Sequence, residues 1–407
     1  MPTPAPSRRT VLTGLATGAA AALTAGLPLP GTARAASATA GTNAYAFLAA
    51  RFDQYGTGTT LRVPQSYTGG YFATIGFVSS FTYDNALVIL AWLASGTSAN
   101  IQRATVLGDT LLYAQAHDPI GDGRTRASYQ PDSFTTLTGS LDIGSPAANT
   151  GNQAWTGIAL ARLYQVTGLS RFLQGAVSLA NWIHTTTWDG TKAPHGYTGG
   201  RDGDNVAYTF KATEHNIDTG AFFTMLGTLT GVSTWTTRAQ AAYAFVAAMQ
   251  NTSTGYVYTG TATDGVTVNP SPVPEDVQTW AYLATGDVRY SPSVTWVLST
   301  LAASDAGFGG CSYSTADTSK VWFEGTAHLA LAVRARGATG DPARYTTLIG
   351  DIESAQSGAA NGDGQGIVAA SSDGLLTGFG DTYYASLHTG ATAWYLLAAA
   401  GYNPFRL

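Results

Sequence analysis

Four acidic side chains stand where carboxylate chemistry is possible. Asp84, Glu214, Glu275 and Glu324 each lie at the start of an apolar, helix-like stretch, beside other polar residues. Polar groups at the start of a buried helix either cap its free backbone N–H groups or face a space where a polar ligand binds. Capping accounts for any one acid more easily than for all four, because Ser and Thr cap equally well. Two carboxylates that share one space can act as a general acid and a general base.

The same helix starts carry side chains that could hold a substrate. These candidates are Tyr83, Trp155, His215, Asn216, Asp218, Trp280, Trp322, His328, Tyr383, Tyr384 and His388. Aromatic faces beside uncharged hydrogen-bonding groups suit sugar rings. Cleavage of a glycosidic bond needs two carboxyl groups and a platform for the ring. Among the acids, Glu214 is the strongest candidate, because its neighbours His215 and Asn216 add hydrogen bonding that a cap does not need.

The helix-like stretches alternate between two kinds. One kind is apolar on nearly every side, which is typical of a buried helix, and its members begin near Asp84, Asn152, Glu214, Glu275, Glu324 and His388. Each of the first five is followed by an amphipathic stretch. The last ends at Gly401 and leaves the N-terminal helix, near 44–53, as its partner. Twelve helices in six pairs predict an all-α (α/α)6 toroid, a single domain over residues 36–407.

The lengths of the connections orient this toroid. A buried helix reaches its amphipathic partner through a few residues around a glycine, whereas the returns are long. The long returns are residues 118–151, 188–213, 251–274, 305–323 and 357–386. They must lie on the face where the buried helices begin. Long loops are usually functional, and the positive helix ends on that face favour anionic side chains and polar ligands.

Residues 1–35 have the features of an export signal. Arg8 and Arg9 form a twin-arginine pattern, a weak apolar run extends to Leu29, and Ala33-Arg34-Ala35 is a small-x-small cleavage site. The run is too short and too broken to span a bilayer stably. We therefore expect the twin-arginine translocation machinery to export the folded chain, and the mature protein to be secreted and free of the membrane.

Composition excludes several classes of partner. The net charge is −5, and loss of three arginines with the signal makes it −5 − 3 = −8, which argues against nucleic-acid binding. The single Cys311 cannot form an intramolecular disulfide, and neither an HExxH motif nor a set of Cys ligands for zinc is present. The segment 361–366 resembles half a calcium loop, but Ser372 stands where a bidentate Glu is needed. We expect no metal, no cofactor and a monomer.

The six helix pairs and their polar starts resemble the six-hairpin glycosidase superfamily of secreted (α/α)6-toroid glycoside hydrolases. Segments 81–86, 213–216, 274–280 and 322–328 carry the resemblance, which covers the mature chain. None is a signature of one family, so no catalytic pair is transferred by motif. The resemblance implies mostly inverting hydrolysis, with the two carboxyl groups about 6.5–9.5 Å apart. Our hypothesis is that Glu214 is the general acid and Asp84 or Glu275 the base, with Glu275 the better spaced.

Two other functions stay open at this stage. A polysaccharide lyase on the same toroid would abstract a proton beside a uronate, using Tyr or His together with Asn and a cation. Candidates such as Tyr383, His215 and Asn216 are present, but basic residues are few. A noncatalytic glycan-binding protein would need only the aromatic and polar groups.

Overall fold

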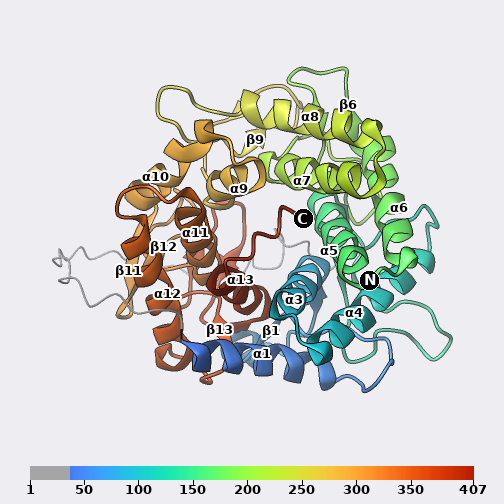
Figure 1. Cartoon of the computed structure of the whole chain (residues 1–407), viewed down its shortest axis with the longest axis horizontal. Coiled ribbons are helices and arrows are strands. Elements are labelled where there is room, and N and C mark those ends of the chain that lie inside the picture. The colour runs from blue at the N-terminus through green and yellow to red at the C-terminus, as the bar shows by residue number, and fades with distance from the viewer. Residues whose placement is uncertain (1–36) are drawn as a thin grey trace.

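The computed structural model describes residues 37–407 and shows two concentric layers of helices (Figure 1). This arrangement confirms the predicted all-α (α/α)6 toroid. The predicted export signal at 1–35 lies outside the described residues. Within the described part of the chain, every helix is too short or too polar to cross a membrane.

The inner layer of the described chain is a closed ring of six helices. They are α3 (Thr82–Ser95), α5 (Thr150–Thr167), α7 (Thr213–Thr230), α9 (Asp276–Thr285), α11 (Phe323–Arg336) and α13 (Thr389–Ala400). Each packs on the next, and α13 packs back on α3. Each ends at a glycine in the left-handed conformation, which stops the helix and begins a short connection.

The outer layer holds the amphipathic helices. They are α1 (Ala38–Asp53), α4 (Ser98–Ala116), α6 (Ser170–Thr187), α8 (Ser233–Ala248), α10 (Ser291–Thr300) and α12 (Asp341–Gly358). As predicted, the N-terminal helix α1 packs on α13 and completes the sixth pair. Two short helices, α2 (Gly70–Thr74) and the 3₁₀ helix η1 (Val288–Tyr290), lie in the connections.

The described strands of the return segments are all short and pair antiparallel. These are β1 (Tyr67–Thr68) and β13 (Ile367–Val368) on either side of β16 (Leu387–His388); β2 (Ser80–Phe81), β3 (Ser128–Tyr129) and β4 (Ile143–Ser145); β5 (Ala148–Asn149) with β8 (Gly200–Arg201); β6 (Trp188–Asp189) with β7 (Gly196–Tyr197); β9 (Gly260–Thr261) with β10 (Val268–Asn269); β11 (Ala302–Asp305) with β12 (Phe308–Cys311); and β14 (Leu375–Leu376) with β15 (Thr382–Tyr383).

Each return segment is hydrogen-bonded to the start of one inner helix, and five of the six segments form a second bond to the next inner helix. In the first bond, the backbone N–H at the start of an inner helix donates to a carbonyl of a return segment. The six pairs are Thr82 to Ala127, Thr150 to Gly199, Thr213 to Thr259, Glu275 to Tyr313, Phe323 to Ala369 and Thr389 to Ser66. The N–H groups that a helix start leaves without intrahelical partners are thereby used to anchor the returns.

In the second bond, the residue two positions earlier in the segment donates its N–H to a side chain on the next inner helix. The five pairs are Thr125 to Gln153, Tyr197 to Asn216, Val257 to Gln278, Cys311 to Thr326 and Ile367 to Thr392. In the sixth segment this residue is Pro64, which has no N–H, and Asn85 instead accepts a bond from the Ser80 hydroxyl.

These anchors give the six helix starts a common register. We number each helix start from the residue whose N–H is anchored, which is position one. In the order of the helices, position two holds Tyr83, Gly151, Glu214, Asp276, Glu324 and Gly390. Position six holds Leu87, Trp155, Asp218, Trp280, His328 and Trp394. Positions two and six lie on the same face of a helix. Ring contacts between Tyr83, Trp155 and Trp280, which come from three different helices, show that this face points to the axis of the toroid.

An aromatic floor fills the middle of the ring. Trp155, Trp280 and Trp394 lie with ring centroids 5.2–5.9 Å apart, and Phe405 lies 5.1, 5.5 and 6.3 Å from the three indoles. Phe405 belongs to the C-terminal segment, which runs from the end of α13 to the centre of the ring (Figure 1). The segment therefore closes the ring from the face where the inner helices end.

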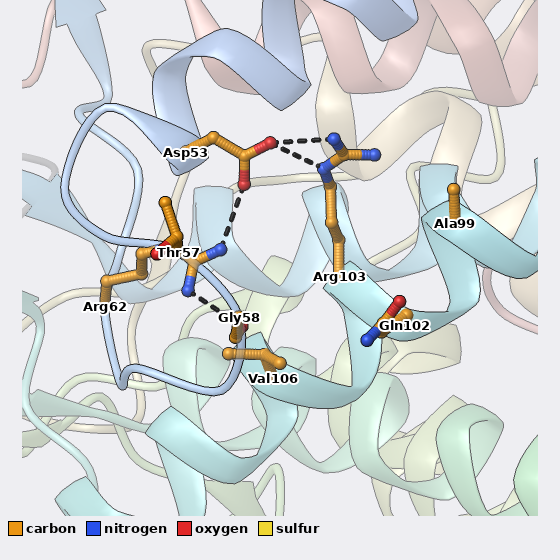
Figure 2. Close-up of a pocket in the computed structure, with 8 residues that line it drawn as sticks. All are labelled: Asp53, Thr57, Gly58, Arg62, Ala99, Gln102, Arg103 and Val106. Atoms are coloured by element: carbon orange, nitrogen blue, oxygen red, sulfur yellow. Dashed lines mark hydrogen bonds and ion pairs between the residues drawn. The ribbon is translucent and has the colours of Figure 1, made fainter.

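A charged brace ties α1 to α4 at the outer surface. Asp53 lies between Arg62 and Arg103, at 3.0 and 2.7 Å, beside a hollow of about 270 Å³ (Figure 2). Burial raises the pKa of Asp53, but the two guanidinium groups outweigh it and hold the pKa below its usual value. Because Arg62 also donates to the carbonyls of Phe52, Gly58 and Thr60, we interpret this hollow as structural.

Candidate active site

Acidic side chains gather on one half of the ring. Position two carries Glu214 on α7, Asp276 on α9 and Glu324 on α11, which are three consecutive inner helices. The other three helices carry Gly390, Tyr83 and Gly151 there. All six positions lie at the long-return face, as the loop lengths predicted. The axis-facing wall is therefore acidic on the side of α7, α9 and α11.

Glu324 is the most closely surrounded of these acids. The Tyr83 hydroxyl donates to its Oε1 at 2.8 Å, and the indole N–H of Trp394 donates to the Tyr83 oxygen at 2.8 Å. His328 Nε2 lies 3.8 Å from the same Oε1, and His388 Nδ1 lies 3.5 Å from Oε2. All five side chains are buried. Residues from α3, α11 and α13 thus fix the orientation of this carboxyl group.

Glu275 contacts the ring nitrogen of His328 that faces away from Glu324. It occupies position one, and its Oε2 lies 3.0 Å from His328 Nδ1. The pKa of Glu275 is raised well above its usual value, first by complete burial and then by the charge of Asp276; the Thr279 hydroxyl opposes this shift and the charge of Glu324 adds to it. Glu275 is therefore a hydrogen-bond partner of the His328 imidazole, and its role as the base stays a prediction.

The raised pKa of Glu275 predicts a pH-dependent effect of Glu275→Gln. A native chain that holds this proton more tightly than the unfolded chain loses stability as pH rises from the usual glutamate pKa to the raised one. Glutamine has no such proton, so the unfolding free energy of the variant should rise relative to wild type across that window. Urea unfolding at several pH values between about 4 and 8 measures the difference. A difference in unfolding free energy between variant and wild type that stays constant with pH would contradict a raised pKa for Glu275.

Asp84 and His388 form a hydrogen-bonded pair between the starts of α3 and α13. His388 Nδ1 accepts the backbone N–H of Ala391 at 3.2 Å and caps α13, which leaves the proton on Nε2 to be donated to Asp84 Oδ2 at 3.3 Å. Tyr67 stacks flat on the imidazole at a centroid distance of 4.2 Å. A Cβ on Gly390 would lie 2.7 Å from Asp84 Oδ1, so the glycine makes room for this pair. Both ring nitrogens of His388 are therefore engaged.

A second pair lies between α5 and α7. A Cβ on Gly151 would lie 2.6 Å from His215 Cδ2 and 3.2 Å from Asp218 Oδ2, so both predicted side chains lean over this glycine. Both are buried, whereas Glu214 beside them is half-buried. The prediction that His215 and Asp218 belong to the same rim as Glu214 agrees with this placement.

Several predicted substrate contacts have other positions in the fold. Asn216 donates to the carbonyls of Tyr197 and Ala212 and accepts the Tyr197 N–H, so its amide holds a return segment and its prediction as a ligand contact is not supported. Trp155 and Trp280 form the buried floor and are not open platforms.

A second aromatic cluster lies among the return segments before α3, α11 and α13. Trp322 packs against Tyr313 and Tyr383 at centroid distances of 4.8 and 5.7 Å. Tyr384 stacks on Tyr71 at 3.9 Å. Of these predicted contacts, the fully buried Trp322 supports the wall of the site, where its ring also meets that of His328 at 5.3 Å.

Asp276 is the residue that the candidate list from the sequence missed. It is buried, accepts the N–H of Val277 on Oδ1 at 2.7 Å, and lies one position after Glu275. Aligning the six helix starts by their anchor residues would have placed it at position two with Glu214 and Glu324.

In the described part of the chain, His, Cys, Asp and Glu side chains form no group of three or more that could hold a metal ion.

No family model matches this chain, and no curated protein matches it in sequence. Solved structures match its fold along nearly their whole length. A D-mannose isomerase has 13% identity and a TM-score of 0.63, covering 90% of this chain and 97% of that one. The GH76 α-mannanase BT2949 of Bacteroides thetaiotaomicron has 12% identity and a TM-score of 0.61, covering 89% and 96%. A cellobiose 2-epimerase from Bacillus thermoamylovorans has 10% identity and a TM-score of 0.63, covering 88% and 98%. These matches support the toroid fold alone, because each is less than 25% identical to this chain.

Proposed function

We propose that this protein is a glycoside hydrolase that cleaves an uncharged poly- or oligosaccharide by inversion. The observation that carries the proposal is the set of carboxyl groups at one axis-facing position on three consecutive inner helices, with Glu324 held by Tyr83. The fold neighbours include a mannanase, which is consistent with a glycan substrate. The twin-arginine pattern at Arg8 and Arg9 supports our further proposal that the protein is secreted.

The positions of the acids suggest their roles. Packed helices lie about 8–10 Å apart, and side chains that point to a common axis converge, so carboxyl groups two helices apart can leave room for a water molecule. We assign Glu324 on α11 as the base and Glu214 on α7 as the acid. Asp276 lies on the helix between them, placed to bind a sugar hydroxyl.

The proposed reaction balances with these groups alone. Glu214 gives its proton to the glycosidic oxygen, and the bond between that oxygen and the anomeric carbon breaks. Glu324 takes a proton from the water whose oxygen attacks the same carbon from the opposite side. The products are a new reducing end of inverted configuration and a free hydroxyl group on the leaving sugar.

A second candidate is sugar epimerisation, which His328 favours. Its Nδ1 is oriented by Glu275, its Nε2 points toward Glu324, and an imidazole in this setting could move a proton beside a sugar carbonyl. An epimerase and an isomerase are among the fold neighbours. Hydrolysis is the better supported, because acidic side chains occupy the axis-facing position two on three consecutive inner helices.

One screen separates the two candidates. The purified mature chain is incubated with yeast α-mannan, laminarin, dextran, xylan, cellobiose and mannose. Hydrolysis predicts new reducing ends from a polysaccharide, with the inverted anomer seen first by NMR. Conversion of cellobiose or mannose to an isomer without new reducing ends would favour the second candidate and overturn the first. Products absorbing near 235 nm would indicate a lyase.

A further inference from the structure

A pocket opens on the long-return face, beside the start of α7. It has a volume of about 200 Å³, and its lining includes Phe210, Ala212, Thr259, Thr261, Asn269 and Phe379. These residues come from three different return segments. Ala212 directly precedes Thr213 and the proposed acid Glu214, so the pocket adjoins the candidate active site.

The pocket is lined by aromatic and uncharged polar groups. Lys211 also lines it, but its ammonium group is buried and bonds to the carbonyls of Lys192, Pro194 and Gly265, with Asp189 at 2.9 Å. The positive charge is therefore neutralised inside the loops. Phenyl faces beside hydroxyl and amide groups suit a neutral pyranose ring better than an anionic sugar.

Phe379 is held rigidly although it is only half-buried. It lies between Gly378 and Gly380, whose φ angles of +79° and +97° strain any other residue, at the tip of the β14–β15 hairpin. The Thr377 hydroxyl accepts the N–H groups of Phe379 and Asp381. The ring of Tyr313 packs edge-on against the Phe379 ring at 6.3 Å. A partly exposed aromatic ring on a braced tip is suited to hold a ligand.

Phe210 is fixed in a different way. A Cβ on Gly199 would lie 2.5 Å from the Phe210 ring, so this ring rests directly on the backbone of the neighbouring segment. The Gly199 N–H also donates to the Phe210 carbonyl at 2.9 Å. Glycines therefore help to place both aromatic residues of the pocket: Gly378 and Gly380 through their positive φ angles, and Gly199 through its close contact with the Phe210 ring.

We propose that this pocket is a subsite for a neutral pyranose unit of the glycan, separate from the unit at which the bond is cleaved. The inference rests on the proposed function and deepens it: an enzyme with such a subsite acts on chains and binds longer oligosaccharides more tightly than short ones.

Affinity electrophoresis tests the subsite apart from catalysis. Glu324→Gln protein, which should not cleave the gel matrix, is run through native gels that contain yeast α-mannan, laminarin, dextran or xylan. We expect at least one polysaccharide to retard it, and Phe379→Ala or Phe210→Ala in the same background to raise the apparent dissociation constant about tenfold. Tyr164→Ala, a half-buried aromatic position at the opposite end of α5, is the matched control and should change nothing.

The outcomes distinguish this inference from the proposed function. Equal retardation of the parent and both Phe variants, or no retardation by any of the four polysaccharides, overturns the subsite. Retardation that depends on Phe379 and Phe210, together with a wild-type enzyme that releases no reducing ends, leaves the subsite standing and overturns hydrolysis. Thermal unfolding of each variant checks that its loss of binding is not loss of the fold.

Discussion

Replacing Glu324 with Gln is expected to lower kcat for glycan hydrolysis about a thousandfold, with little change in KM. Glutamine keeps the oxygen that accepts the Tyr83 hydroxyl, so the buried hydrogen-bond network should survive. It cannot take the proton from water, which is the step assigned to Glu324. Initial rates of reducing-end release on the polysaccharide found in the screen give kcat and KM for the variant.

Matched variants make this result specific. Asp109→Asn changes a carboxylate on the outer helix α4 that pairs with Arg171 at the surface, and should leave kcat unchanged. Glu214→Gln should lose activity on the polysaccharide but recover it on a glycosyl fluoride, whose leaving group needs no protonation. A Glu324→Gln enzyme with kcat near that of wild type would rule out Glu324 as the base.

Replacing Phe405 with Ala should lower the free energy of unfolding by about 3–4 kcal/mol. Phe405 is 2% exposed and contacts all three indoles of the aromatic floor, so truncation leaves a cavity where rigid rings cannot collapse. Chemical denaturation with urea measures the change. Leu407→Ala, at a half-buried position two residues later, serves as the control and should cost less. A loss below about 1 kcal/mol for Phe405→Ala would mean that the ring does not depend on its C-terminal segment.

The architecture could be predicted from the sequence because its signals are local. Stretches that are apolar all round and stretches with one apolar face alternate, and glycines such as Gly231 and Gly337 mark where buried helices stop. Long returns then placed the polar helix starts on one face. These features depend on a few neighbouring residues at a time, so no tertiary information was needed to find them.

The individual site residues were harder to predict, because a shift of one position turns a helical side chain by about 100°. Glu275 and Asp276 look equivalent in the sequence, yet the first lies behind His328 and the second at the axis-facing position. Asn216 looks like a ligand contact beside Glu214, but it faces a return segment. The role of Phe405 depends on where the chain end lies in space, for which local sequence carries no signal.

Threonine hydroxyls at the starts of four inner helices also bond to the return segments, and these bonds indicate the order in which such a ring can assemble. Thr82, Thr150 and Thr213 bond through their hydroxyls to carbonyls only 44, 48 and 45 residues further along the chain. Thr389 bonds to the carbonyl of Gln65, which is 324 residues away. The chain can therefore form as a linear array of neighbouring hairpins, with low contact order, until its two ends meet. The junction of α13 with α1 and β1 is the seam that turns this array into a closed ring, and Pro64, which lacks the N–H that the other segments donate, lies at that seam.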